Sequence, residues 1–119
     1  MTEAISQATV SMTAHLKAAA IISLTETGYT SRQISKYRPD CPILAITASP
    51  VVVRKLAMNW GVIPLLYGGE PTDNARIDFG IARARELMNI GAGDILVVAA
   101  GQHQKAGGTD LIRVITLEN

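Results

Sequence analysis

Two patterns of apolar residues alternate along the chain, and they predict helices and strands in turn. Residues 2–17 carry apolar side chains at helical spacing from Ile5 to Leu16, which predicts an amphipathic helix. The next run, residues 19–24, is almost entirely apolar and indicates a strand covered on both faces. The same patterns predict further helices over 30–37, 50–59 and 73–89, and further strands over 42–47, 62–66, 94–100 and 111–117.

Start and stop signals support several of these boundaries. Ser49 followed by Pro50 provides an N-cap and a proline at the first helical position. Thr72 is placed to cap the longest predicted helix, and Gly91 to end it. Pro64 falls inside the third predicted strand, where it is tolerable only if its missing N–H donor is not needed.

The order of the elements predicts an α/β fold. Strands separated by helices need crossover connections, which favour a mostly parallel sheet with helices on both faces. The last strand follows its neighbour after a loop with no helix, so we expect it to be an antiparallel edge strand. The prediction is a three-layer sandwich with about five strands, forming one domain over residues 1–119.

Composition excludes several classes of function. The formal charge of +1 offers no electrostatic basis for binding nucleic acid or an anionic membrane. Cys41 is the only cysteine, which rules out an intramolecular disulfide and favours the reducing cytoplasm. No signal-peptide pattern is visible at the amino terminus, and the apolar runs are far shorter than the roughly 20 residues of a membrane span.

Two polar loops follow predicted parallel strands, at the edge of the sheet where α/β proteins bind ligands. The first, residues 25–30, combines threonine hydroxyls with a glycine and the amides of a helix start, which together suit a phosphate. The second loop covers residues 101–110. Candidate binding residues in the two loops are Thr25, Thr27, Gly28 and Thr30, and then Gly101, Lys105, Gly107, Gly108 and Thr109.

A purely structural interpretation of the first loop stays open. Threonine and glycine at a strand-to-helix turn also serve as a helix cap, and most such turns bind nothing. The loops contain neither a Walker lysine nor the G-x-G-x-x-G pattern of dinucleotide sites. His15 and His103 have no glutamate or cysteine at metal-ligand spacing, so we predict no catalytic residue and no metal site.

An ordered set of motifs resembles the carboxy-terminal domain of pyruvate kinase over nearly the whole chain. The motifs are "TETGYT", "SKYRP", "AITAS", "WGVIP", "GDILVVAAG" and "GGTDLIRV". No single motif is specific for this family, but the six motifs in this order are.

The resemblance implies the function of a larger enzyme. Pyruvate kinase transfers a phosphoryl group from phosphoenolpyruvate to ADP, with magnesium and usually potassium. That chemistry belongs to a (β/α)8 barrel and a lid domain, so this chain alone is expected to be an inactive regulatory part that needs no cofactor itself. The implied effector site holds phosphate at Thr25, Thr27, Gly28 and Thr30, receives a second phosphate at Arg76, and is closed by the loop containing Gly101, Lys105 and Gly107.

Departures from the family pattern reduce the number of candidate effector compounds. Glu26 stands where activator-sensitive animal members have a lysine, and a carboxylate there opposes a second phosphate. Residues 67–72 lack the tryptophan that some members use, and Thr109-Asp110 replaces the usual threonine-asparagine. These differences argue against fructose 1,6-bisphosphate and favour AMP or a sugar monophosphate such as ribose 5-phosphate.

The resemblance also implies partners. Family members are homotetramers, and the expected edge strand between Leu111 and Leu117 is a natural surface for a second copy, because unpaired edges seek partners. The catalytic barrel would be the other partner.

The sequence leaves two alternatives to the regulatory domain of a larger enzyme. One is a free-standing α/β protein that binds a phosphorylated metabolite, and the other is a small enzyme using the same loops. Met1 directly before the first predicted helix favours a domain fragment over the free-standing protein.

Overall fold

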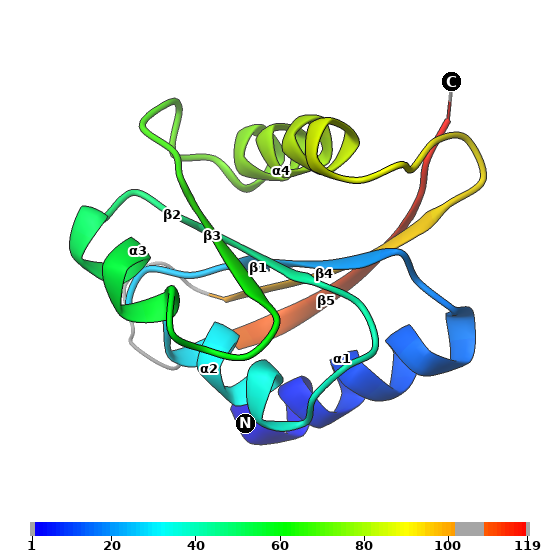
Figure 1. Ribbon diagram of the computed structural model, residues 1–119, viewed down its shortest axis with the longest axis horizontal. Coiled ribbons are helices and arrows are strands. Elements are labelled where there is room, and N and C mark those ends of the chain that lie inside the picture. Colours follow the sequence, from blue (N-terminus) through cyan, green and yellow to red (C-terminus); the bar gives the residue numbers. More distant parts are fainter. Residues whose placement is uncertain (1, 102–108, 119) are drawn as a thin grey trace.

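The computed structural model describes residues 2–101 and 109–118, which form a five-stranded sheet between two layers of helices (Figure 1). The helices are α1 (Thr2–Leu16), α2 (Tyr29–Lys36), α3 (Pro50–Leu56) and α4 (Asp73–Leu87). The strands are β1 (Ala20–Leu24), β2 (Ile43–Thr47), β3 (Val62–Leu66), β4 (Ile95–Gly101) and β5 (Thr109–Thr116).

The strands lie in the order β3-β2-β1-β4-β5. β1 pairs with β2 and β4 in parallel, and β2 pairs with β3 in parallel. β5 runs antiparallel to β4 at one edge. The predicted mostly parallel sheet with an antiparallel last edge strand is therefore confirmed.

Alternate residues of the central strands face the two helical layers. Ile22 of β1 packs in one cluster with Ile77 and Ala84 of α4. Its neighbour Ile21 packs on the opposite face with Ile34 of α2 and Leu56 of α3. Figure 1 shows α4 on one side of the sheet and α1, α2 and α3 on the other. Burial on both faces explains why β1 reads as an apolar run instead of an alternating one.

Several helices end earlier than the sequence predicts, for local reasons. After α1, Lys17 takes a left-handed φ of 53°, and the Ala18 amide donates to the Thr13 carbonyl at 3.0 Å. Arg38 takes a similar φ of 46° after α2. Left-handed residues that end helices are usually glycine, so these basic residues gave no stop signal. α3 and α4 end at Leu56 and Leu87, three and two residues before the predicted ends.

Candidate functional site

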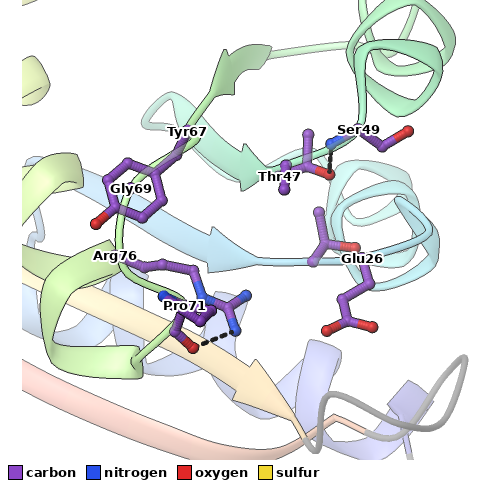
Figure 2. A pocket seen from close by; sticks show the side chains of 9 residues that line it. Glu26, Thr47, Ser49, Tyr67, Gly69, Pro71 and Arg76 are labelled. Carbon is purple, nitrogen blue, oxygen red and sulfur yellow. Dashed lines mark hydrogen bonds between the residues drawn. The ribbon is translucent and has the colours of Figure 1, made fainter.

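A cavity of about 330 Å³ opens at the carboxyl ends of β1, β2 and β3, beside the first turn of α4. Figure 2 shows side chains from both helical layers surrounding it. This is the edge at which ligands bind in open α/β sheets. The lining residues are Thr25, Glu26, Thr47, Ala48, Ser49, Tyr67, Gly69, Pro71 and Arg76.

The turn between β1 and α2 is built around Gly28. The Gly28 backbone has a φ of 87°, and a Cβ there would lie 3.2 Å from side-chain atoms of Val52 and Leu56. Both facts favour glycine, which tolerates left-handed backbone and close approach. Gly28 is the N-cap of α2 and makes no side-chain cap bond, so a glycine, and not a threonine, occupies the N-cap position itself.

Threonine hydroxyls instead stabilise the turn itself. The Gly28 amide donates to Thr25 Oγ1 at 2.8 Å, and the Tyr29 amide donates to Thr27 Oγ1 at 3.3 Å. In both bonds the hydroxyl oxygen is the acceptor. Because a hydroxyl also has one O–H to donate, the buried Thr25 can hold the turn and offer a proton to the cavity.

The turn after β2 repeats this arrangement. The Ser49 amide donates to Thr47 Oγ1 at 3.1 Å, and Ser49 Oγ accepts from the Val52 amide at 3.3 Å as the N-cap of α3. Thr25, Thr47 and Ser49 thus give the cavity three hydroxyls whose oxygens already accept a backbone N–H. The sequence indicated Ser49 as a helix cap, and it did not indicate Thr47 as a site residue. Thr47 is the last residue of β2 and Ser49 follows it closely, so their place at the carboxyl end of a strand was the available signal.

Arg76 supplies a buried cation. It lies in the first turn of α4, behind the Thr72 N-cap, and the whole residue is only 8% exposed. Its Nη2 lies 3.5 Å from the Pro71 carbonyl oxygen and 3.9 Å from Asp73 Oδ1. These contacts hold the guanidinium at the wall of the cavity. A buried arginine with a planar array of donors is well suited to phosphate or carboxylate.

Glu26 is the second charged residue of the lining. It is exposed and comes from the β1–α2 turn, across the cavity from α4. Figure 2 shows its carboxylate and the Arg76 guanidinium on opposite sides of the space between them. The cavity therefore has a cationic side and an anionic side.

The structure brings together some of the residues that the sequence singled out. Thr25 and Arg76 come from distant parts of the chain and line the same cavity. Thr27, Gly28 and Thr30 form the adjoining turn and are not among the lining residues. Gly101 is the last residue of β4. Lys105 and Gly107 lie outside the described residues.

Other chemical groups give no sign of catalysis within the described ranges. Over residues 2–101 and 109–118, no group of three or more histidine, cysteine or acidic side chains could hold a metal ion. His15 is exposed on α1, with Nδ1 2.9 Å from the Ser11 carbonyl oxygen. Burial raises the pKa of the Cys41 thiol to about 11, which disfavours the nucleophilic thiolate. Among the described helices, none is long and apolar enough to cross a membrane.

The fold and the cavity define an α/β domain with a site suited to a small anion. The sequence profile of the family described as "Pyruvate kinase, alpha/beta domain" matches residues 3–115. The chain belongs to this family, as the motif resemblance predicted.

Curated relatives agree with this assignment. The chain is 40% identical to the pyruvate kinase of Clostridium acetobutylicum over 117 residues, which is 98% of this chain and 25% of the relative. It is 46% identical to pyruvate kinase 2 of a Synechocystis species over 93% of this chain and 19% of the relative. Pyruvate kinase 1 of Saccharomyces cerevisiae is 38% identical over 98% of this chain and 24% of the relative. The chain spans about a fifth to a quarter of the length of these relatives.

Proposed function

We propose that this chain is the regulatory and oligomerisation part of a pyruvate kinase and binds a phosphorylated effector in the cavity. The observation that carries the proposal is that the buried Arg76 and three hydroxyl groups line one cavity at the ligand-binding edge of the sheet. The parent enzyme would transfer phosphoryl from phosphoenolpyruvate to ADP in the cytoplasm, using magnesium and potassium. This chain would add control and assembly to that reaction.

The donors of the cavity support recognition of phosphate. Arg76 presents guanidinium N–H groups, and Thr25, Thr47 and Ser49 can each donate an O–H while their oxygens accept backbone amides. Charge-assisted hydrogen bonds from arginine to phosphate are stronger than neutral ones. The neighbouring turn with Thr27, Gly28 and Thr30 adds the amides of the α2 amino terminus to this environment.

Charge favours a monophosphate. The volume of about 330 Å³ lies within the roughly 300–1,000 Å³ typical of small-molecule sites, so size does not separate the candidate compounds. A second phosphate placed across from Arg76 would meet the carboxylate of Glu26. The charges of the lining therefore suit AMP or a sugar monophosphate better than fructose 1,6-bisphosphate.

Control of the parent enzyme would pass through assembly. In this proposal the effector orders the loops around the cavity, and the effect reaches the barrel and a second copy bound along β5. Coupling between distant sites typically amounts to about 1–3 kcal/mol, which is enough to change activity several-fold.

A thermal-shift titration of the chain tests the proposed site. The probes are AMP, ribose 5-phosphate, glucose 6-phosphate and fructose 1,6-bisphosphate. A ligand at about 100 times its Kd adds roughly 2.7 kcal/mol of stability, so one of the monophosphates should raise Tm measurably. The Arg76→Gln variant should lose this increase, because the cation facing the phosphate is gone.

A matched control separates binding from general stability. Arg85 lies on the same helix, is exposed, and donates to the Glu118 carbonyl outside the cavity. Arg85→Gln makes the same change of charge and should keep the ligand-induced increase in Tm. An unchanged Tm with all four compounds, or an equal increase in Arg76→Gln, would refute the proposed effector site.

A further inference from the structure

We propose that a second cavity, at the amino ends of β1 and β2, binds a small dicarboxylate between Lys17 and Arg38. These two cations follow α1 and α2 and line the cavity. The inference does not rest on the proposed effector site, which lies at the opposite edge of the sheet.

The second cavity has a volume of about 340 Å³, which is within the roughly 300–1,000 Å³ of typical small-molecule sites. Its lining comes from the end of α1, from Ala18 before β1, and from residues 38–41 between α2 and β2. Figure 1 shows α1 and α2 on the same side of the sheet. The chain segments that leave these two helices therefore enclose a space of the size of a small metabolite.

Both cations of the lining have a left-handed backbone. Among the described residues other than glycine, Lys17 and Arg38 are the two with positive φ, at 53° and 46°, and both line this cavity. Glycine adopts this conformation without the steric penalty that a Cβ brings. Other residues held in it are concentrated at ligand-binding and active sites. The coincidence points to a role for the two side chains that glycine could not fulfil.

Helix capping does not account for these side chains. After α1 the Ala18 amide donates to the Thr13 carbonyl at 3.0 Å, and after α2 the Arg38 amide donates to the Ser35 carbonyl at 3.0 Å. Backbone N–H groups thus bond carbonyls at both helix ends. Within residues 2–101 and 109–118, the ion pairs between side chains do not include Lys17 or Arg38. Their charges are therefore available to a ligand.

Arg38 is also held in place. Its guanidinium carbon lies over the Trp60 ring, 5.2 Å from the ring centroid. A cation–π contact of this kind restricts the guanidinium without using its N–H donors. Arginine binds a carboxylate through two parallel hydrogen bonds, so Arg38 suits one carboxylate of the ligand and Lys17 the other.

The remaining lining residues define the body of the ligand. Val10, Ala14, Ala18 and Pro39 are apolar and suit a short hydrocarbon between two carboxylates. Succinate has this composition. Asp40 also lines the cavity, and its negative charge weakens the binding of an anion. Removal of that charge therefore gives a test with the opposite sign.

Calorimetric titration of the chain with succinate and with butyrate tests the inference. Butyrate has the same length but a single carboxylate. The ionic strength is kept constant, because salt screens exposed charges. We expect succinate to bind about fivefold more tightly than butyrate. Lys17→Gln should reduce this ratio to about twofold, the statistical advantage of two identical carboxylates. Asp40→Asn should bind succinate more tightly than the wild type does.

Two control variants locate the binding. Lys36 is also exposed and lies in the last turn of α2, but it does not line the cavity, so Lys36→Gln should keep the full preference. Arg76→Gln removes the cation of the effector cavity and should bind succinate as the wild type does. Trp60 is the only tryptophan of the chain, and its fluorescence should change on addition of succinate in both controls.

Lys17→Gly separates binding from folding. Glycine suits the left-handed backbone at this position, so the Tm without ligand should be equal to or above that of the wild type. This variant should lose the preference for succinate as Lys17→Gln does.

Several results would overturn the second site. They are a wild-type preference of about twofold or less, a preference that persists in both Lys17 variants, and equal weakening by Lys17→Gln and Lys36→Gln. Loss of succinate binding in Arg76→Gln would also overturn it, because the ligand would then lie in the effector cavity. None of these results bears on the binding of phosphorylated compounds, which tests the effector site separately.

Discussion

Cys41 lies two residues before β2 and shows how burial changes the chemistry of a single side chain. The pKa of this thiol rises from 9.0 to about 11, mainly because burial removes the thiol from water. A backbone hydrogen bond lowers the pKa and the charge of Asp40 raises it, and both effects are smaller. There is therefore a pH range in which the Cys41 thiol is neutral in the folded protein and ionised in the unfolded chain.

This pKa predicts a loss of stability in alkaline solution. Between about pH 9 and pH 11 the unfolded state releases the Cys41 proton and the folded state retains it. The free energy of unfolding should therefore fall as pH rises through this window, by about 1.4 kcal/mol at pH 10, with no contribution well below pH 9. Urea unfolding of the wild type and of Cys41→Ala at pH 8, 9 and 10 measures this difference.

Other titrating groups affect both proteins equally, so the comparison isolates the thiol. The stability of the wild type relative to Cys41→Ala should decrease from pH 8 to pH 10. Parallel curves for the two proteins would show that the thiol ionises equally in both states.

At the residue scale, the sequence correctly predicted helix starts that depend on a capping side chain within the same turn. Ser49 and Pro50 begin α3 and Thr72 caps α4 as predicted, because caps depend on residues a few positions away. The left-handed backbone of Lys17 and Arg38 was not predictable from residue type, because the residue that usually adopts it at a helix end is glycine.

Close packing between α4 and the sheet depends on Gly80. A Cβ at this position would lie 2.6 Å from Ile46 Cδ1 and 3.2 Å from Ile22 Cδ1. Both isoleucines are fully buried, so neither end has free space to move into. The missing side chain at Gly80 lets the helix approach β1 and β2.

We expect Gly80→Ala to destabilise the protein by about 1–3 kcal/mol through overpacking, although alanine gains about 1 kcal/mol in helix propensity. Ile46→Val removes the Cδ1 atom that clashes, so the double variant should be more stable than the sum of the single effects predicts, by about 0.5 kcal/mol or more. Denaturant unfolding of the four proteins in this cycle measures the coupling.

Ile43 provides the matched control for this cycle. It is also a fully buried isoleucine of β2, but it packs on the face opposite α4. Ile43→Val combined with Gly80→Ala should be additive within about 0.5 kcal/mol. Additivity in both cycles would mean that Ile46 does not limit the approach of α4.

Helices and strands could be told apart in the sequence because the burial of an element determines where its apolar residues fall. β1 and β2 read as apolar runs since both of their faces are covered. Pro64 is accommodated in β3 because β3 is an edge strand of the described sheet, where it pairs with β2. The cavity was only partly predictable, because Thr47 and Arg76 meet through the order of strands and the packing of α4, which no local pattern encodes.

At the scale of the whole molecule, the free edge of β5 is the surface that we expect a second copy to use. Among the described strands, β5 pairs with β4 alone, and an open edge can extend its hydrogen bonding to another chain. Val114 in this strand is 42% exposed, which places an apolar side chain beside the expected contact.

Sedimentation of the chain should therefore give twice the mass of one copy, and Val114→Glu should halve that mass because it places a carboxylate on the strand expected to form the contact. Val51→Glu is the matched control, since Val51 is 49% exposed on α3, away from β5. A monomeric wild type, or equal dissociation by both variants, would refute pairing through β5.

The cavity has a mechanical consequence that follows from its position at the end of the sheet. Ser49 belongs to the helical layer on one face, and Arg76 belongs to the layer on the other. An occupant that contacts both residues would act as a clip joining the two outer layers where the strands stop. Binding would then stiffen the domain across its thickness without requiring any helix to shift. A neighbouring domain packed against either helical layer would then contact a surface that fluctuates less.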